Sequence, residues 1–493
     1  MKLGFDHDLY TSLQSQYIRQ RIDQFGGKLY LELGGKLFDD HHAARVLPGF
    51  RPDSKISMLL NLKDQAEIII AINADDIEKN KVRGDLGITY DADVLRLIDA
   101  FRACGLYVGA VVITQYTAQS HAAKFRRHLR QLGIKVALHY PIANYPSDVN
   151  LIVSEKGFGK NEFVQTDRPL ILVTAPGPGS GKMAVCLSQL FQEHQRGVKA
   201  GYAKFETFPI WNLPLSHPVN VAYEAATVDL NDVNMIDPFH LDKYGVSTVN
   251  YNRDIEVFPI LNASFERIWG ESPYFSPTDM GVNMAGRCIL DDQAVQQAAR
   301  QEVIRRYYTT LCEARKGIAT EEEVDKLRML MQKLSLTDEE RPVIAAARKR
   351  AETTNAPASA IMLPSGEVVT GKTSALLGAS AALLLNALKR LAGIPKATRL
   401  IPPEVIGPVQ QLKCEYLGNN NPRLHTDEVL VALSITAAES QVAALAMAQL
   451  KLLKGCEVHT SVILSQVDEK VFRSLGVNLT SEPKYQTHKL FHG

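Results

Sequence analysis

The sequence lacks an excess of charge and any long apolar run, and each absence excludes a class of protein. Its 493 residues carry 55 lysines and arginines against 54 aspartates and glutamates, a formal net charge of +1. No long basic or acidic block gives a nucleic-acid or membrane-surface role electrostatic support. The longest apolar stretch, Ser374 to Leu388, is interrupted by Asn386 and is shorter than the roughly 18 residues of a membrane span. We therefore expect neither nucleic acid nor a membrane among its partners.

The sequence also lacks paired cysteines and a recognisable leader. Its six cysteines are widely spaced and form no CxxC motif, which is typical of reduced, structural thiols. No closed set of four cysteine or histidine ligands exists, so we expect no structural zinc. The segment Met1–Tyr10 has aspartates and a histidine where a signal peptide has a basic start and an apolar core. These features predict a cytoplasmic protein.

The length and the order of apolar segments predict three domains. Residues 1–287 alternate strand-like and helical patterns, which is typical of an α/β domain with a Rossmann-like or P-loop-like parallel sheet. Residues 288–355 form a predicted helical domain, and residues 356–493 a smaller C-terminal α/β domain. The strands expected in the first domain are Lys28–Leu33, Glu67–Ile72, Tyr107–Thr114, Val136–Tyr140, Leu151–Val153, Leu170–Thr174 and Val198–Lys204.

The helical domain has no strand signal and begins one of its helices with a capping box at Thr320. Its role is that of a spacer or an oligomerisation element, so a homo-oligomer is one expectation. In the C-terminal domain we expect a hairpin with its turn at Ser365-Gly366. We also expect helices over Thr373–Leu391 and Ala437–Lys454, and a strand over Glu457–Leu464.

The segment "TAPGPGSGKM", Thr174 to Met183, follows a predicted strand and precedes a predicted helix, the order found in phosphate-binding P-loops. Small residues let the backbone approach an anion, and the helix amino terminus favours negative charge. The spacing matches GxxxxGK[ST] except at its ends, where Pro176 replaces glycine and Met183 replaces the hydroxyl residue that holds Mg²⁺. We expect a phosphate or nucleotide here; the alternative is a structural turn with a solvated lysine. The predicted cofactor-binding residues are Gly177, Gly179, Ser180, Gly181 and Lys182.

A second segment, "GEVVTGKT" from Gly366 to Thr373, matches the same motif letter for letter. Its glycines are separated by a strand-like run, so we do not expect the full motif to form one phosphate-binding loop. Lys372 and Thr373 are retained as substrate-binding candidates, because the sequence predicts that they begin a long helix whose amides could bind an anion.

Polar residues follow the first two predicted strands, where ligands bind in α/β sheets. Lys36 and Arg45 are candidates for contacts to a substrate or a phosphate. Metal coordination by the run Asp39 to His42 is a weaker alternative to a solvated loop, since adjacent ligands seldom reach one ion. Asp75 and Asp76 are candidate catalytic carboxylates that could hold Mg²⁺, and the alternative is that they cap a helix.

Two further segments supply substrate-binding candidates. Arg83 lies in an irregular stretch that we interpret as a substrate loop. The polar segment His217–Asp242 shows no helical or strand period, and long irregular loops are often functional. From it we select Glu224, Asp229 and Asp232, of which the two aspartates are an alternative metal-holding pair. An ordinary packed connection is the competing interpretation.

The segments "GGKLFDDHHAARVLPGF", "TAPGPGSGKMAVCLSQL", "AYEAATVDLNDVNMIDPFHLD" and "VVTGKTSALLGASAALLLNALK" together resemble an uncharacterised bacterial family, domain of unknown function 1846, over nearly the whole chain. The resemblance implies a cytoplasmic, multi-domain α/β protein without an established activity. Some relatives carry the label "ATP-dependent peptidase", but this sequence contains no HExxH or GxSxG motif. The loop at Pro176 is also similar to the P-loop of formyltetrahydrofolate-synthetase-type ligases.

The leading hypothesis is a nucleotide-dependent enzyme, a ligase or a phosphotransferase, that acts on a small anionic metabolite. ATP or another nucleotide with Mg²⁺ would be its cofactor. Lys182 and the loop amides would stabilise charge on the transferred phosphate. The alternative is a non-catalytic module that binds a nucleotide or a phosphorylated metabolite. An ATP-dependent peptidase is not expected.

Overall fold

The computed structural model describes residues 3–35, 37–38, 40–83 and 86–486. Two compact units divide the chain, one made of Lys2–Glu224 and Asp232–Ala298, the other of Ala225–Asn231 and Ala299–Gly493. Within the described ranges, no helix combines the length and the apolar character that a bilayer crossing requires.

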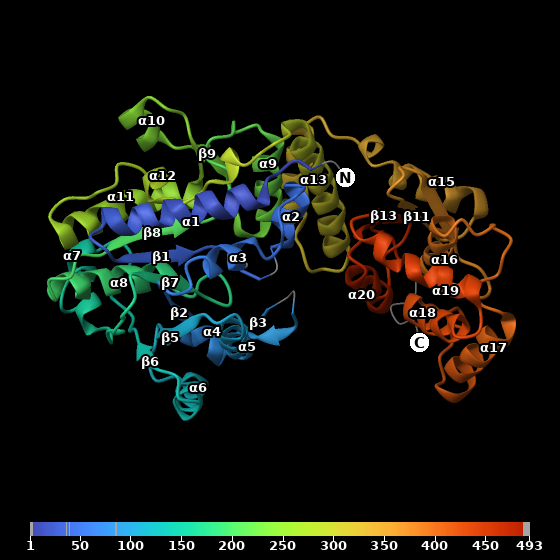
Figure 1. Ribbon diagram of the computed structural model, residues 1–493, viewed down its shortest axis with the longest axis horizontal. Helices are drawn as coiled ribbons and strands as arrows, with labels where there is room; N and C mark the ends of the chain where they lie inside the picture. Colours follow the sequence, from blue (N-terminus) through green and yellow to red (C-terminus); the bar gives the residue numbers. More distant parts are fainter. Residues whose placement is uncertain (1–2, 36, 39, 84–85, 487–493) are drawn as a thin grey trace. The chain divides into compact units, whose positions relative to one another are not determined.

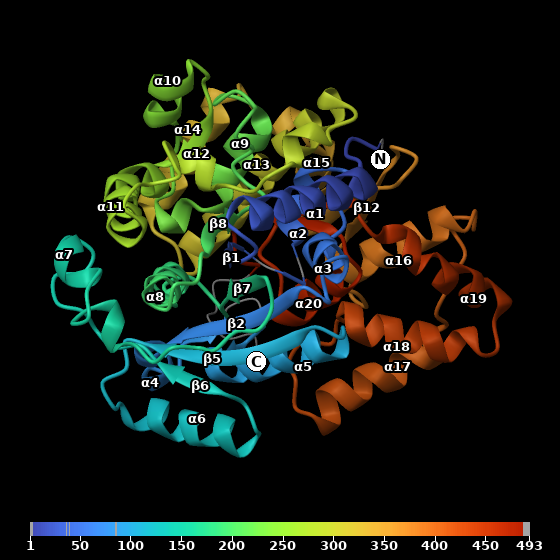
Figure 2. The ribbon, with the colours of Figure 1, turned by 60° about the vertical axis from the view of Figure 1, so that its left-hand side comes forward.

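The first unit is built on a six-stranded sheet in which every neighbouring pair is parallel. Its order is β6-β5-β2-β7-β1-β8, which Figure 2 shows from bottom to top. β7 therefore lies between β1 and β2. The chain forms β2, β5 and β6 on one side of the sheet before it enters β7 in the middle. The bounds are β1 Leu29–Leu33, β2 Ala66–Asn73, β5 Tyr107–Thr114, β6 Val136–Leu138, β7 Leu170–Thr174 and β8 Gly201–Phe205.

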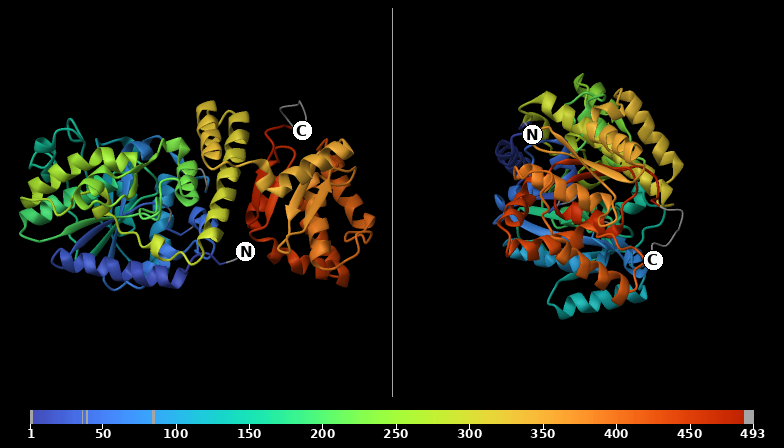
Figure 3. Two further views of the ribbon diagram at one scale, coloured as in Figure 1. Left: turned by 90° about the horizontal axis from the view of Figure 1, so that it is seen from above. Right: turned by 90° about the vertical axis from the view of Figure 1, so that its right-hand side faces the viewer.

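Helices cover both faces of this sheet because its strands are apolar on both sides. Along β1, Leu29, Leu31 and Leu33 belong to one core cluster, whereas Tyr30 belongs to the other. The first cluster packs against α1 (His7–Gln24), α3 (Ser54–Leu60), α5 (Tyr90–Ala103) and α6 (Ser120–Gln131). The second packs against α7 (Val149–Ile152), α8 (Lys182–Gln195), α11 (Asn252–Trp269) and α12 (Pro277–Met280). Figure 3 (left) shows α1 and α11 on opposite sides of the sheet.

The second unit contains a mixed four-stranded sheet with the order β12-β11-β13-β14, of which Figure 1 labels β11 and β13. β11 is antiparallel to both neighbours, and β13 and β14 are parallel. The helical region before it consists of α13 (Asp292–Arg315), α14 (Glu321–Lys333) and α15 (Pro342–Thr354), of which α15 packs on β11. The strands are β11 Ala358–Met362, β12 Val368–Lys372, β13 Glu457–Thr460 and β14 Asn478–Ser481.

Five helices follow the hairpin of the second unit and pack into one apolar cluster. The parallel α/β sheet, the helical region and a C-terminal sheet domain are therefore as predicted, and the placing of the domain boundaries at 287 and 355 stays a prediction. The helices are α16 Ala379–Leu391, α17 Pro403–Gln411, α18 Thr426–Ala437, α19 Gln441–Ala448 and α20 Gln466–Ser474.

Four local predictions were wrong. Leu151–Val153 does not form a strand, because Asp148 caps the short helix α7 there. The helix expected from Thr373 begins only at Ala379. The helix expected over Ala437–Lys454 is interrupted, because Ser440 starts a new helix by accepting a hydrogen bond from the Ala443 amide. The segment His217–Asp242 is not irregular: it holds α9 (Pro218–Ala226), strand β9 (Asn234–Ile236) and the start of α10 (Pro238–Tyr244).

Candidate functional site

The glycine-rich segment forms the predicted turn between β7 and α8. Gly179 and Gly181 have φ angles of +76° and +83°, a region that glycine adopts without steric cost. Gly181 is the residue before the first helical turn, and no side chain caps that turn among the described residues. The first amides of an α-helix have no partner within the helix. The 14-residue helix α8 therefore presents uncapped amides and its positive end at this turn.

The carbonyl groups of the turn are held by hydrogen bonds to neighbouring side chains. Ser180 Oγ donates to the Gly177 carbonyl at 2.8 Å, and Thr114 Oγ1 donates to the Ser180 carbonyl at 2.9 Å. Asn73 Nδ2 lies 3.4 Å from the Gly179 carbonyl oxygen. Three carbonyl oxygens, which would repel an anion, are thereby occupied. The hydroxyl of Ser180 stabilises the loop through this hydrogen bond, and its role in binding a cofactor stays a prediction.

Lys182 and Met183, the first two residues of α8, have different surroundings. Lys182 is half-buried, and no described carboxylate lies within ion-pair distance of it. Met183 packs against the apolar cluster between the sheet and α8. This packing explains why an apolar side chain occupies the position where a P-loop holds Mg²⁺ through a hydroxyl.

The predicted carboxylates Asp75 and Asp76 lie at the end of β2, the strand beside β7. They occupy the first turn of α4 (Ala74–Glu78), whose N-cap Asn73 accepts a hydrogen bond from the Asp75 amide. Gln119 donates a hydrogen bond of 3.0 Å to Asp75, and Lys81 forms a 3.2 Å ion pair with Asp76. The two carboxylates thus follow the strand beside β7, and the residue of that strand end that contacts the loop is Asn73. Within the described ranges, no three histidine, cysteine or acidic side chains gather closely enough to hold a metal ion.

On the other side of the loop, beyond β1, lies a buried ionic cluster that the sequence did not predict. Lys204, in β8, has its Nζ 2.7 Å from both oxygens of Asp254 and 3.3 Å from Glu206 Oε1. Tyr251, which ends β10 (Val249–Tyr251), contacts Lys204 and donates to the Glu206 carboxylate at 2.6–2.8 Å. Glu32 of β1 adds a third carboxylate and accepts a 2.8 Å hydrogen bond from Tyr202. A lysine within the apolar strand sequence "GYAKF" was the available signal.

Burial and neighbouring charges shift the pKa values of Glu206 and Lys204 in this cluster. Burial raises the pKa of Glu206, although the ammonium of Lys204 opposes that shift. For Lys204, burial lowers the pKa but the carboxylates of Asp254 and Glu206 outweigh it, so its pKa is raised and it is charged at neutral pH. A small pocket of about 50 Å³ borders Lys204, Glu206 and Asp254. A hollow of about 370 Å³ near the end of α8 contains none of the predicted site residues.

The remaining candidates are placed as follows. Arg83 donates to the buried Asp93 at 2.8 Å, and Arg253 forms a 2.6 Å ion pair with Asp232, so both predicted residues already have charged partners. Glu224 lies half-buried on α9, Asp229 is exposed, and Arg45 lies half-buried on α2 (His41–Val46). Lys36 and Asp39 lie outside the described residues.

The second motif folds as a hairpin, as its sequence predicted. Gly366 has a φ of +84° in the turn, and Gly371 and Lys372 belong to β12. A β-carbon at Gly371 would collide with the backbone of Leu383, so this glycine serves packing. Because α16 begins at Ala379, Lys372 and Thr373 are not in its first turn, and the expected anion site at a helix start loses its structural basis there.

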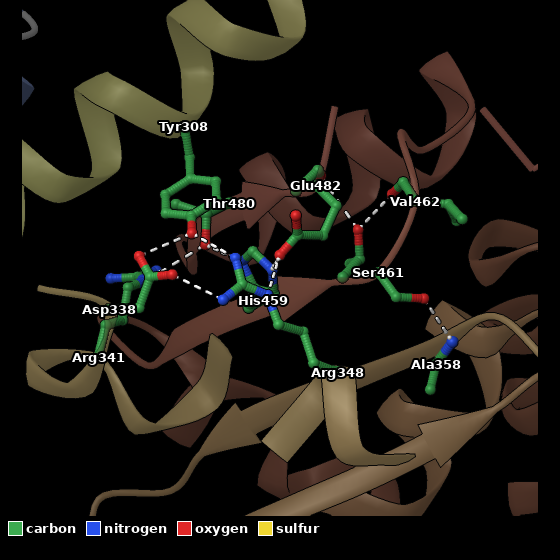
Figure 4. Close-up of polar contacts among 12 residues, drawn as sticks. Tyr308, Asp338, Arg341, Arg348, Ala358, His459, Ser461, Val462, Thr480 and Glu482 are labelled. Atoms are coloured by element: carbon green, nitrogen blue, oxygen red, sulfur yellow. Dashed lines mark hydrogen bonds and ion pairs between the residues drawn. The ribbon is translucent and has the colours of Figure 1, made fainter. Parts of the chain in front are cut away.

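The densest polar network of the second unit surrounds His459 (Figure 4). The His459 ring is fully buried, with Nδ1 2.8 Å from Thr480 Oγ1 and Nε2 3.2 Å from Glu482 Oε1. Arg348 donates to Glu482 and to Asp338, both at 2.6 Å. Both ring nitrogens of His459 are engaged and shielded from solvent, so the network joins α13 and α15 to β13 and β14 and does not form an accessible site.

Comparisons with known proteins match the whole chain to one family. The model described as "Domain of unknown function DUF1846, N-terminal" matches residues 3–335, and its C-terminal counterpart matches residues 339–491. UPF0371 proteins of Streptococcus pyogenes serotype M28 and Streptococcus thermophilus are each 57% identical to it and cover 99% of both chains. Neither description mentions formyltetrahydrofolate synthetase, so the likeness of the loop to that ligase group stays a prediction.

Proposed function

The chain belongs to the DUF1846 family, and because that description carries no activity we propose a function from the geometry of the loop after β7. We propose that Gly177–Lys182 binds the phosphate groups of a nucleotide, and that the protein is an enzyme of the ligase or phosphotransferase type. The observation that carries the proposal is the uncapped amino terminus of α8, next to a turn in which the carbonyl oxygens of Gly177, Gly179 and Ser180 already accept hydrogen bonds. An anion at this position would satisfy the helix amides.

The surroundings of the loop support a catalytic role. Lys182 supplies a positive charge without a described ion-pair partner. Asp75 and Asp76 follow β2, the strand on one side of β7, and Glu206 and Lys204 lie beyond β1 on the other side. In phosphoryl transfer, positioned cations and amides stabilise the charge that develops on the phosphate oxygens. The small anionic metabolite that would receive the phosphate is part of the proposal.

A non-catalytic nucleotide-binding module is the second candidate, and the packing of Met183 favours it. Met183 packs against the apolar cluster and has no oxygen that could coordinate Mg²⁺, so this loop lacks the metal ligand of ordinary P-loop enzymes. Turnover of ATP with Mg²⁺ and a panel of small anionic metabolites distinguishes the two candidates. Binding of ATP without turnover under all conditions would favour the module.

Substitution of Lys182 tests the phosphate site directly. Lys182→Ala removes one charged hydrogen-bond donor and leaves the glycine backbone in place, so it should weaken ATP and pyrophosphate binding by about 10- to 150-fold. Lys182→Arg keeps the charge and should lose less. The matched control is Lys372→Ala, which alters the lysine of the second motif and should leave affinity unchanged. Calorimetric titration measures all four proteins, and equal affinities for wild type and Lys182→Ala would refute the site.

A further inference from the structure

The amino terminus of α8 and the carboxylate of Glu206 lie at the same edge of the six-stranded sheet and on the same face. Phe205 packs in the core cluster on the α1 face, so the alternation of a strand directs its neighbours Lys204 and Glu206 to the α8 face. β7 and β8 are separated only by β1. Two strand spacings place the ends of β7 and β8 about 10 Å apart.

The side chain of Glu206 extends across the end of β1. A β-carbon at Gly34, the residue after β1, would lie 2.5 Å from Glu206 Cγ and 2.7 Å from Oε1. Glycine at this position is therefore what allows the side chain to extend from β8 over β1 in the direction of β7. Gly35 follows, so the chain leaves β1, the strand between β7 and β8, with two residues that have no side chain.

The chemistry of the cluster is that of a hydrogen-bond acceptor. Glu206 and Asp254 contact the single ammonium of Lys204 and the charge of Glu32 also acts on it, so the carboxylates of the cluster outnumber its cation. The side chain of Glu206 retains 25% of its exposed area, more than the 16% of Lys204 or Asp254. Each ionised carboxylate oxygen accepts more than one hydrogen bond. A ligand that reaches Glu206 should therefore present hydroxyl donors.

We propose that Glu206 accepts hydrogen bonds from the ribose hydroxyls of a nucleoside di- or triphosphate whose phosphates lie at the first turn of α8. The inference rests on the proposed function, because it assumes that the loop binds phosphate. A nucleotide extended across Gly34 and Gly35 spans the separation between the two groups. An acidic side chain at a strand end that binds ribose is a general solution in doubly wound sheets.

The test compares ATP with 2′,3′-dideoxy-ATP, which lacks both ribose hydroxyls, on wild type and on Glu206→Gln by calorimetric titration. Wild type should bind ATP about 10-fold or more tightly than the dideoxy analogue, the usual effect of hydrogen bonds to a charged group. Glu206→Gln should lose most of that preference. Its affinity for the dideoxy analogue and for pyrophosphate should stay within about twofold of wild type, because neither ligand has a ribose hydroxyl to contact residue 206.

Two results would overturn the inference: equal wild-type affinity for the two nucleotides, or an equal loss for both in Glu206→Gln. Pyrophosphate separates this failure from that of the proposed function, because pyrophosphate binding that depends on Lys182 would persist if only the ribose contact were wrong. If Glu206→Gln does not fold, Glu206→Asp enters the same comparison. It keeps the charge but withdraws the carboxylate from Gly34, and it should lose part of the preference for ATP.

Discussion

The position of the turn after β7 depends on the absence of a side chain at Gly177. A β-carbon at Gly177 would collide with the hydroxyl and the ring of Tyr90, the first residue of α5. Lys81 Nζ lies 5.0 Å from the centre of the same ring, so the aromatic side chain is held from the other side. The loop can approach the sheet edge only because residue 177 is glycine.

Gly177→Ala should therefore destabilise the protein by about 1–3 kcal/mol, the usual effect of overpacking, and should weaken phosphate binding because the turn must shift. The control is Gly407→Ala, in helix α17, where a β-carbon meets nothing within 4 Å. Alanine favours a helix, so this change should be neutral or stabilising by up to about 1 kcal/mol. Urea unfolding curves measure both, and similar effects at the two positions would contradict the packing argument.

Glu482 and His459 should make the second unit sensitive to acid. Burial raises the pKa of Glu482, but the hydrogen bonds from His459 and Arg348 outweigh it and lower the pKa to about 2. Ionised Glu482 therefore contributes about 3 kcal/mol to the free energy of unfolding at pH values above its unfolded pKa of about 4.5. This contribution is lost as the pH falls towards 2. Burial lowers the pKa of His459, so protonation of the unfolded imidazole below about pH 6.5 acts in the same direction.

The measurement is the free energy of unfolding of wild type and Glu482→Gln between pH 7 and pH 2. The difference between them should be largest at neutral pH and should shrink as the pH falls below about 4.5. Glu367→Gln is the control, since Glu367 pairs with Arg390 at an exposed site and should show little pH dependence. A difference that does not vary with pH would argue against a role for this ionisation.

Among elements, one buried arginine adds polar contacts to the packing of α15 on the C-terminal sheet. Arg341, 1% exposed, donates to the carbonyls of Val458 at 3.2 Å and Asn478 at 2.8 Å and forms an ion pair with Glu457. It thereby satisfies backbone groups of β13 and β14 from the residue that precedes α15. The predicted helical domain thus shares a core and a polar network with the sheet that follows it.

Arg341→Met should cost about 3–5 kcal/mol, because it removes the charged partner of Glu457 and one hydrogen bond from each of two carbonyl groups. Arg390→Met removes an exposed partner of Glu367 and should cost less than about 1 kcal/mol. Chemical denaturation followed by circular dichroism compares the two variants. A cost for Arg341→Met as small as that of the surface variant would show that the buried pair is dispensable.

The sequence predicted those elements whose pattern is local and left out those set by distant contacts. Continuous apolar runs identified β1, β2, β5 and β7, because strands of a parallel sheet are buried on both faces. Leu151–Val153 has the same composition, but a capping aspartate makes it helical. Similarly, the apolar run from Thr373 starts its helix six residues late, because Thr373 first pairs with Pro357 and Leu377 with Leu424.

In the candidate site, too, the part formed by consecutive residues was predicted and the part formed by distant residues was not. The turn from Gly177 to Lys182 lies on consecutive residues, so its composition and order were enough to locate it. The cluster of Lys204, Glu206 and Asp254 comes from a strand, the residue after it and a helix 50 residues further along the chain, and its polar atoms meet only after folding. The sequence also selected Arg83 and Asp232 as ligand contacts, although each is neutralised by an opposite charge on another element.

At the scale of the whole molecule, the six cysteines are all free and differ in exposure. Cys186, Cys288, Cys312 and Cys456 are buried, and burial raises the pKa of Cys288 and Cys456 to about 11 and of Cys312 to about 12. A thiol reacts as its thiolate, so these groups should react slowly at neutral pH. Only Cys104 and Cys414 are partly exposed.

Native protein should therefore release about two equivalents of thiolate rapidly with a chromogenic disulfide reagent, and denatured protein about six. Cys104→Ser and Cys414→Ser should each remove one rapid equivalent. Fewer than six equivalents after denaturation without reductant would reveal a disulfide. Rapid reaction of more than two would indicate that a buried core opens on the time scale of the assay.

The short segment Ala225–Asn231 belongs to the second unit, whereas the residues on both sides of it belong to the first. This interleaving has a consequence for synthesis on the ribosome. The segment is synthesised about 70 residues before Ala299, where the rest of its unit begins. At ordinary translation rates, roughly 4–14 s pass between the synthesis of the segment and that of Ala299. At that point α14, which Lys326 connects to Asn231, has not been made. The first unit must therefore reach its native arrangement around a section of chain that is not its own.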